Sequence, residues 1–158
     1  MRLFRPIRKN NEGAAIIEFA IVAPALFLVL VGFIELGLIL FTTSVLEGAT
    51  NVGARIGSTG YTTQNLDRSA YIINQINSLS GGFLNPALLQ VSIASYTGFS
   101  VIGNPANSTG TTGGYGGNVV VYTVTYPWTL FTPLMGNLLG TGGVYTITAV
   151  ALVRNEQF

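Results

Sequence analysis

The sequence predicts an α+β protein in which a long N-terminal transmembrane helix extends into a small extracytoplasmic domain, with a second helix and a three-stranded, mostly antiparallel sheet. Three observations favour this fold. Residues 14–41 are almost continuously apolar. Apolar residues then recur at helical spacing as far as Ile56. Three later segments have the alternation or the β-branched composition of strands.

The composition leaves room for one small domain after the helix, because the chain has 158 residues. Only 8% of the residues are charged. Residues 1–13 hold four basic residues and one acidic residue, a net charge of +3, whereas the remainder holds three basic and five acidic residues, a net charge of −2. The basic residues therefore belong to a leader, and no nucleic-acid surface is expected.

Cysteine and histidine are both absent from the chain. Disulfides, thiolate nucleophiles and Cys-ligated zinc are thereby excluded, together with the commonest general base. We expect no catalytic residue, no metal site, no cofactor and no small-molecule substrate, and so no enzyme.

The predicted transmembrane helix covers residues 14–41 and follows a basic leader, residues 1–13. At ~1.5 Å per residue it is about 42 Å long, more than the ~30 Å hydrocarbon core of a bilayer. The basic leader predicts a cytoplasmic N-terminus and an extracytoplasmic domain over residues 42–158. A cleaved secretory signal is the competing interpretation, but its apolar region should have only about 7 to 15 residues.

The same helix is expected to continue to about residue 57, since Gly57 and Gly60 punctuate the pattern there. Pro24 lies in the membrane part, where neighbouring helices can satisfy the backbone group that it leaves free. Beyond the membrane, one apolar stripe is predicted to face the domain: Ile34, Leu38, Phe41, Val45, Ala49, Val52 and Ile56.

A second helix is expected, capped by Asn65 or Asp67 and ended by Ser80-Gly81-Gly82, with Leu66, Ala70, Ile73 and Ile76 on one face. Strands are expected at residues 89–94, at residues 119–126 where Pro127 closes the strand, and at residues 144–153. The Gly-rich residues 97–118 predict a long exposed loop, and residues 127–140 an irregular crossover with at most one or two helical turns.

Glu18 is the fifth residue of the apolar run. A carboxylate inside the membrane costs about 2.5 to 3.5 kcal/mol, so it normally has a partner or a function. Two interpretations remain open. Glu18 either snorkels to the interface near Arg8 and Lys9, or it pairs with the α-amine that cleavage after Gly13 would free on a neighbouring, staggered helix.

Residues 13–19, Gly-Ala-Ala-Ile-Ile-Glu-Phe, resemble the processing motif of type IV prepilins. With Glu18-Phe19-Ala20, Pro24, Ile34-Glu35-Leu36-Gly37 and Ala54-Arg55, the segment resembles the TadE-like minor pilins, or prepseudopilins, of the tight-adherence (Tad/Flp) type IV pilus system. The resemblance covers about residues 10–57, and Arg154-Asn155-Glu156 is similar to the closing residues of the family.

The resemblance implies a type IV pilin-like fold and a minor pilin or pseudopilin that acts in pilus assembly, surface adherence and biofilm formation. A prepilin peptidase would cut between Gly13 and Ala14, and Glu18, Phe19 and Pro24 would serve assembly. The implied partners are this peptidase, other Tad pilins and the inner-membrane assembly platform. The implied location is the bacterial inner membrane, crossed once with the N-terminus in the cytoplasm, before any incorporation into the pilus.

Two further charged residues are possible interface positions. Glu35 is interpreted as solvated at the outer membrane interface, in preference to meeting a neighbouring helix. Arg55 either binds Glu156 or a partner, or is a solvated cation at the helix end. The alternative function is a membrane-anchored extracytoplasmic binding module with an uncleaved signal anchor, and a weaker one is an anchored hydrolase that uses Ser or Thr with Asp67 or Glu156.

Overall fold

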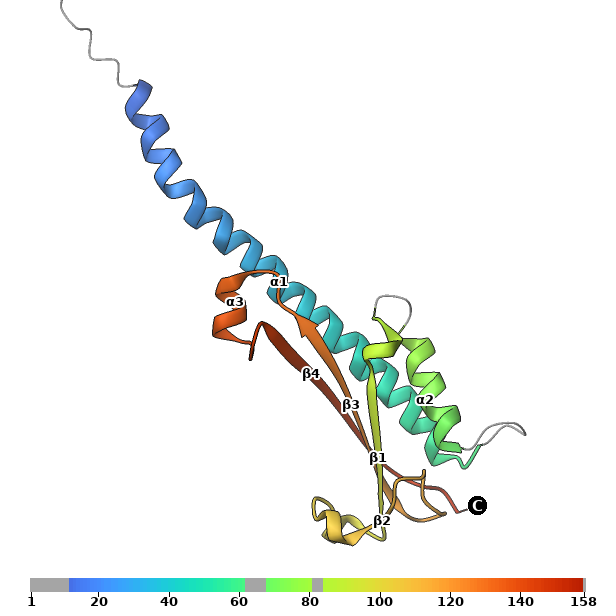
Figure 1. Ribbon diagram of the computed structural model, residues 1–158. Helices are drawn as coiled ribbons and strands as arrows, with labels where there is room; N and C mark the ends of the chain where they lie inside the picture. Colours follow the sequence, from blue (N-terminus) through green and yellow to red (C-terminus); the bar gives the residue numbers. More distant parts are fainter. Residues whose placement is uncertain (1–11, 62–67, 81–83, 158) are drawn as a thin grey trace, which may run out of the picture.

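The computed structural model describes residues 12–61, 68–80 and 84–157. A long helix, α1 (Glu12–Ser58), projects from a domain that contains α2 (Arg68–Leu79), α3 (Pro133–Leu138) and a four-stranded sheet (Figure 1). The expected α+β class is confirmed. Most of the predicted leader, both predicted caps of the second helix and its predicted glycine ending lie outside the described residues.

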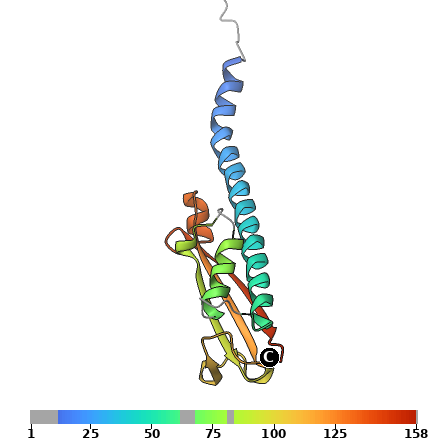
Figure 2. The ribbon, with the colours of Figure 1, turned by 90° about the vertical axis from the view of Figure 1, so that its right-hand side faces the viewer.

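The first helix is continuous over 47 residues and includes Pro24. Its N-terminal half stands free of the domain, and its C-terminal half lies along the sheet (Figure 2). The prediction of a single helix that runs from the apolar segment into the domain is therefore confirmed. Its observed end, Ser58, lies one residue beyond the predicted end.

The face of α1 that packs on the domain is offset by one residue from most of the predicted stripe, although Ala49 is buried as predicted and Leu38, Val45 and Ile56 are half-buried. Ile34, Phe41 and Val52 of that stripe are exposed. One residue corresponds to a rotation of about 100° around a helix with 3.6 residues per turn. The buried face also follows helical spacing, but it contains more small and polar residues: Gly32, Glu35, Ile39, Thr42, Leu46, Ala49, Thr50, Gly53, Ala54 and Gly57.

Small residues on this face allow α1 to pack closely against α2 and the sheet. A Cβ atom on Gly53 would lie 2.5 Å from Cγ1 of Ile76 in α2, and one on Gly57 would lie 2.2 Å from the hydroxyl oxygen of Tyr122 in the sheet. The buried hydroxyl of Thr50 donates to the carbonyl of Leu46 at 2.7 Å, so this polar group is satisfied within the helix. Close packing of α1 on α2 and the sheet is therefore more favourable than burial of the larger apolar side chains in the predicted stripe.

The sheet has the strand order β2-β1-β3-β4 with antiparallel pairing throughout. Its strands are β1 (Gln90–Tyr96), β2 (Ser108–Gly110), β3 (Val119–Thr129) and β4 (Val144–Arg154). The predicted number of three strands is wrong, because β2 forms inside the segment that was expected to be a loop. There the hydroxyl groups of Ser95 and Thr109 lie 3.0 Å apart, so side chains reinforce this short pairing.

The central strand β3 does not end at Pro127 as predicted. Its pairing with β1 begins at Thr125, opposite Gln90, so beyond that point β3 has only β4 as a neighbour. Proline is tolerated in a strand where one side is an edge, because its missing N–H removes no ladder hydrogen bond there. Pro127 pairs with Thr146 and the strand continues to Thr129.

The remaining segments are short. Three-residue 3-10 helices occupy Pro86–Leu88, Phe99–Val101 and Pro105–Asn107. The crossover after β3 contains only the six-residue α3, which agrees with the predicted one or two turns.

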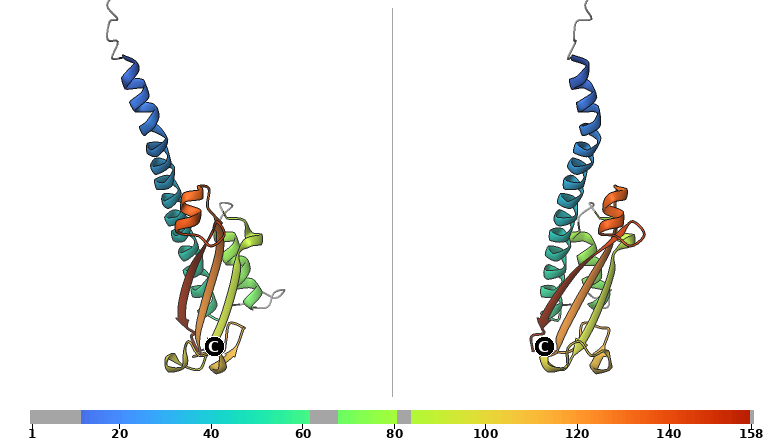
Figure 3. Two further views of the ribbon diagram at one scale, coloured as in Figure 1. Left: turned by 60° about the vertical axis from the view of Figure 1, so that its left-hand side comes forward. Right: turned by 90° about the vertical axis from the view of Figure 1, so that its left-hand side faces the viewer.

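One core joins the sheet to the helices. In Figure 3, α1 and α2 cover the same face of the sheet, and the opposite face is uncovered. Alternate residues of β3 and β4 point into this core, where they meet Leu46 and Ala54 of α1 and Ile72 and Ile76 of α2. The buried sheet residues are Val120, Tyr122, Val124, Tyr126, Trp128, Ile147, Ala149 and Ala151.

Candidate functional site

The free half of α1 is the first candidate site. Among residues 13–31, only Ala23 is buried, and every other side chain is exposed. Of the described residues, only the helix from Gly13 to Ser58 is long and apolar enough to cross a membrane, with a mean hydropathy of 2.6 in its most apolar part. The free half therefore has the length and surface of a membrane span.

The predicted processing and assembly residues lie on this free half. Gly13 and Ala14 are exposed in the first turns of α1. Ala14 and Glu18 are four residues apart and therefore lie on one face of the helix. Glu18 is exposed and has no hydrogen bond or ion pair with any described residue. Phe19 is also exposed, next to it.

Glu35 is not solvated, in contrast to the favoured interpretation from the sequence. Its side chain is 1% exposed. One carboxyl oxygen accepts a hydrogen bond from the backbone N–H of Phe131, and the other accepts one of 2.6 Å from the hydroxyl of Thr132. The same hydroxyl accepts from the N–H of Met135 at 3.3 Å and so caps α3. Glu35 therefore holds the start of α3 against the middle of α1.

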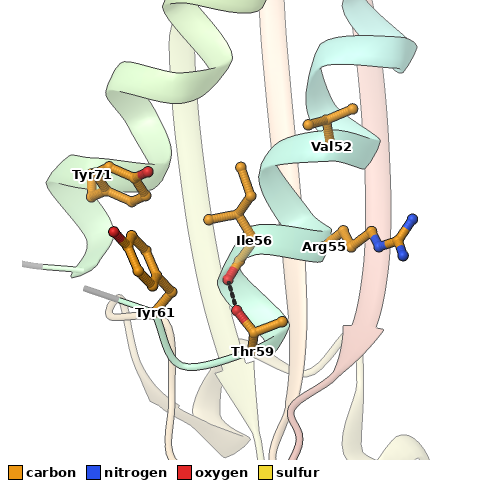
Figure 4. Close-up of a pocket in the computed structure, with 6 residues that line it drawn as sticks. All are labelled: Val52, Arg55, Ile56, Thr59, Tyr61 and Tyr71. Atoms are coloured by element: carbon orange, nitrogen blue, oxygen red, sulfur yellow. Dashed lines mark hydrogen bonds between the residues drawn. The ribbon is translucent and has the colours of Figure 1, made fainter. Parts of the chain in front are cut away.

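Arg55 lies beside a hollow of about 360 Å³ at the distal end of α1. Figure 4 shows its guanidinium directed away from Tyr61 and Tyr71, whose ring centroids are 5.5 Å apart. Among the described residues, no ion pair joins Arg55 to Glu156. The tail reaches this end of α1 through its backbone instead, because the N–H of Glu156 donates to the carbonyl of Ser58 at 2.9 Å.

Asn155 is a structural residue that the sequence analysis did not single out on its own. Its side-chain amide is buried and donates to the carbonyls of Gly113 and Tyr115 at 2.8 and 2.9 Å. Its backbone N–H donates to the carbonyl of Asn118 at 2.8 Å. The tail therefore clamps the Gly-rich loop to the end of the sheet. In the sequence, the position of Asn155 directly after a strand is the signal that could have indicated this role.

The aromatic residues at the crossover divide into two groups. Tyr126 and Trp128 are buried, whereas Phe131 is exposed. The rings of Trp128 and Phe131 are arranged edge to face with centroids 5.9 Å apart. Within the described ranges, no group of three or more metal-ligating side chains is found.

The comparison with protein families matches one segment of the chain. The family model described as "TadE-like protein" matches residues 13–55, which include the free half of α1 and most of the half that packs on the domain. No curated protein and no solved structure gives a significant match. The TadE-like family is associated with the Tad pilus and is a structural, non-enzymatic family. The long apolar helix agrees with anchoring by a single pass through a membrane. The predicted resemblance is confirmed, because residues 13–55 of this chain are similar to the TadE-like family.

Proposed function

We propose that the protein is a minor pilin, or pseudopilin, of a Tad/Flp type IV pilus. In this proposal a prepilin peptidase removes residues 1–13. Helix α1 then leaves the inner (cytoplasmic) membrane and assembles with other Tad pilins on the assembly platform in that membrane. The C-terminal domain lies outside the cytoplasm, and the activity of the assembled pilus is adherence and biofilm formation.

The observation that carries the proposal is the free, apolar half of α1 with Glu18 exposed upon it. An isolated carboxylate in hydrocarbon costs about 2.5 to 3.5 kcal/mol. Cleavage after Gly13 would create a second charge within the membrane, the α-ammonium of Ala14. A neighbouring helix staggered by a few residues lets the carboxylate of one subunit meet the ammonium of the next, which satisfies both charges.

The outward face of α1 gives independent support for assembly. Ile34, Phe41 and Val52 are exposed although they follow the helical spacing of a packed stripe. The domain packs on another face of α1, so the side chains of Ile34 and Val52 remain largely exposed. In the proposed function, the helices of neighbouring subunits cover them when α1 leaves the lipid.

Processing is tested by the intact mass of the protein purified from membranes of cells with and without the peptidase. We expect the peptidase to remove the mass of residues 1–13 from the original protein and not from Gly13→Leu. Gly37→Leu is the matched control, because Gly37 lies in the same helix, is exposed and has nothing within 4 Å of an added Cβ. Retention of residues 1–13 in the presence of an active peptidase would instead support the anchored binding module.

A further inference from the structure

The first step concerns how much of α1 is free to lie in lipid. After Ala23, the first buried residue of α1 is Gly32, where an added Cβ would lie 2.8 Å from Cε of Met135. Residues 13–31 therefore form the exposed part of the helix, about 28 Å at ~1.5 Å per residue. This length matches the ~30 Å hydrocarbon core. A span limited to these residues would be shorter than the predicted residues 14–41, because one side of residues 32–41 lies against the domain.

The second step concerns the surface of the domain at that level. In Figures 1 to 3, α3 lies at the end of the domain nearest the free half of α1. Phe131, Leu134 and Leu138 follow each other at spacings of three and four residues and are exposed, as is Leu139. Leu138 is 71% exposed. We refer to these four residues, Phe131, Leu134, Leu138 and Leu139, as the α3 patch.

The third step concerns charge. The sequence contains no charged residue between Arg68 and Arg154. Glu35, which lies at the level of α3, is buried beneath Phe131 and Thr132 and presents no carboxyl group to the surroundings. This end of the domain can therefore approach a lipid surface without removing any charge from water.

Aromatic residues lie beside the patch. Trp128 pairs with Tyr145 across β3 and β4, and Tyr145 is partly exposed. A hollow of about 190 Å³ is lined by Leu88, Trp128 and Phe131, among others. Tryptophan and tyrosine gather where membrane proteins cross from hydrocarbon to water.

We propose that the α3 patch rests in the interfacial layer of the bilayer that α1 spans, on the leaflet facing the domain, and that lipid is its partner. Lipid is favoured as the occupant because α3 lies at the end of the domain nearest the free half of α1, and the length of that half places α3 at the bilayer surface. Glu35 sets the position of the patch by holding α3 to α1 at this depth. The proposal goes beyond the pilus function, since it depends only on membrane insertion of α1.

The test uses the absence of cysteine from the chain, which lets a single nitroxide label be placed at will. Full-length Leu138→Cys and Leu152→Cys are labelled and reconstituted at low density in vesicles of phosphatidylethanolamine and phosphatidylglycerol. Leu152 is the matched control, an exposed leucine near the far end of β4. Collision rates with oxygen, which concentrates in lipid, and with a water-soluble nickel chelate are then measured.

We expect the ratio of oxygen to nickel collisions to be several-fold higher at position 138 than at position 152. Equal ratios typical of water at both positions would overturn the proposal. Protection of position 138 from both reagents, with spin–spin broadening, would overturn it in favour of a second copy of the chain. Phe131→Cys provides a second label position, also exposed, should labelling at 138 disturb the fold.

Discussion

The hydroxyl of Thr132 donates a 2.6 Å hydrogen bond to the carboxyl group of Glu35, 97 residues earlier in the chain. With the N–H of Phe131 on the other carboxyl oxygen, this contact connects the crossover between β3 and β4 to the middle of α1. A carboxyl group in an apolar helix is thus used as an internal acceptor. The contact determines where along α1 the domain begins.

Glu35→Ala is expected to lower the free energy of unfolding by about 2 to 5 kcal/mol, because two part-buried hydrogen bonds to the carboxyl group are lost. The measurement is urea denaturation in detergent micelles, followed by the fluorescence of Trp128, the one tryptophan of the chain. Thr132→Ser is the control, since it retains the hydroxyl and should change stability little. An unchanged free energy for Glu35→Ala would contradict the anchoring role.

Two glycines of α1, one packed closely on the sheet and one exposed, predict opposite effects when they are replaced by alanine. Gly57→Ala should destabilise by about 1 to 3 kcal/mol, because the new Cβ would overlap the fully buried ring of Tyr122. Gly48→Ala should stabilise by about 0.5 to 1 kcal/mol, because Gly48 is exposed, has open space around an added Cβ and lies in a helix interior. The same denaturation measurement compares them, and equal effects would argue against this close approach.

The clamp made by the tail predicts local consequences for Asn155→Ala. Loss of two hydrogen bonds to the carbonyls of Gly113 and Tyr115 should cost about 1 to 3 kcal/mol. Asn155→Asp should cost more at neutral pH, because a carboxylate would replace the donor that faces two carbonyl oxygens. Hydrogen exchange at the N–H of Gly117, which donates to the carbonyl of Asn155 at 3.1 Å, reports the loosening. Unchanged exchange in both variants would exclude the clamp.

Assembly is expected to depend on Glu18 and not on Glu47, which is also an exposed carboxylate of α1. Glu18→Ala should leave cleavage after Gly13 largely intact and strongly reduce the amount of this subunit recovered with sheared pili or with the assembly platform. Glu47→Ala is the matched control, because Glu47 is exposed on the half of α1 that packs on the domain. Normal recovery of Glu18→Ala would remove the charge-pairing mechanism and leave the processing step untouched.

The elements of this protein follow from local sequence pattern. The apolar run, the helical spacing beyond it and the β-branched residues 119–126 predict α1, much of β1, most of β3 and β4 with little error, since each pattern depends on neighbouring residues. The processing motif at Gly13 and Glu18 is equally local, and the family match covers the residues that carry it.

The sequence by itself therefore determined the fold class, the long helix and the position of Glu18 on its free half. Only the tertiary structure decided which face of α1 is buried, that β3 passes through Pro127, and that Glu35 is an internal acceptor. The physical reason is that each of these depends on a partner far along the chain. The face of α1 with Gly53 and Gly57 is buried because Ile76 and Tyr122 pack closely against it. Strand β3 can contain Pro127 because β1 ends before that point and leaves one side of β3 unpaired. Thr132 reaches Glu35 only because the sheet brings the crossover back to α1.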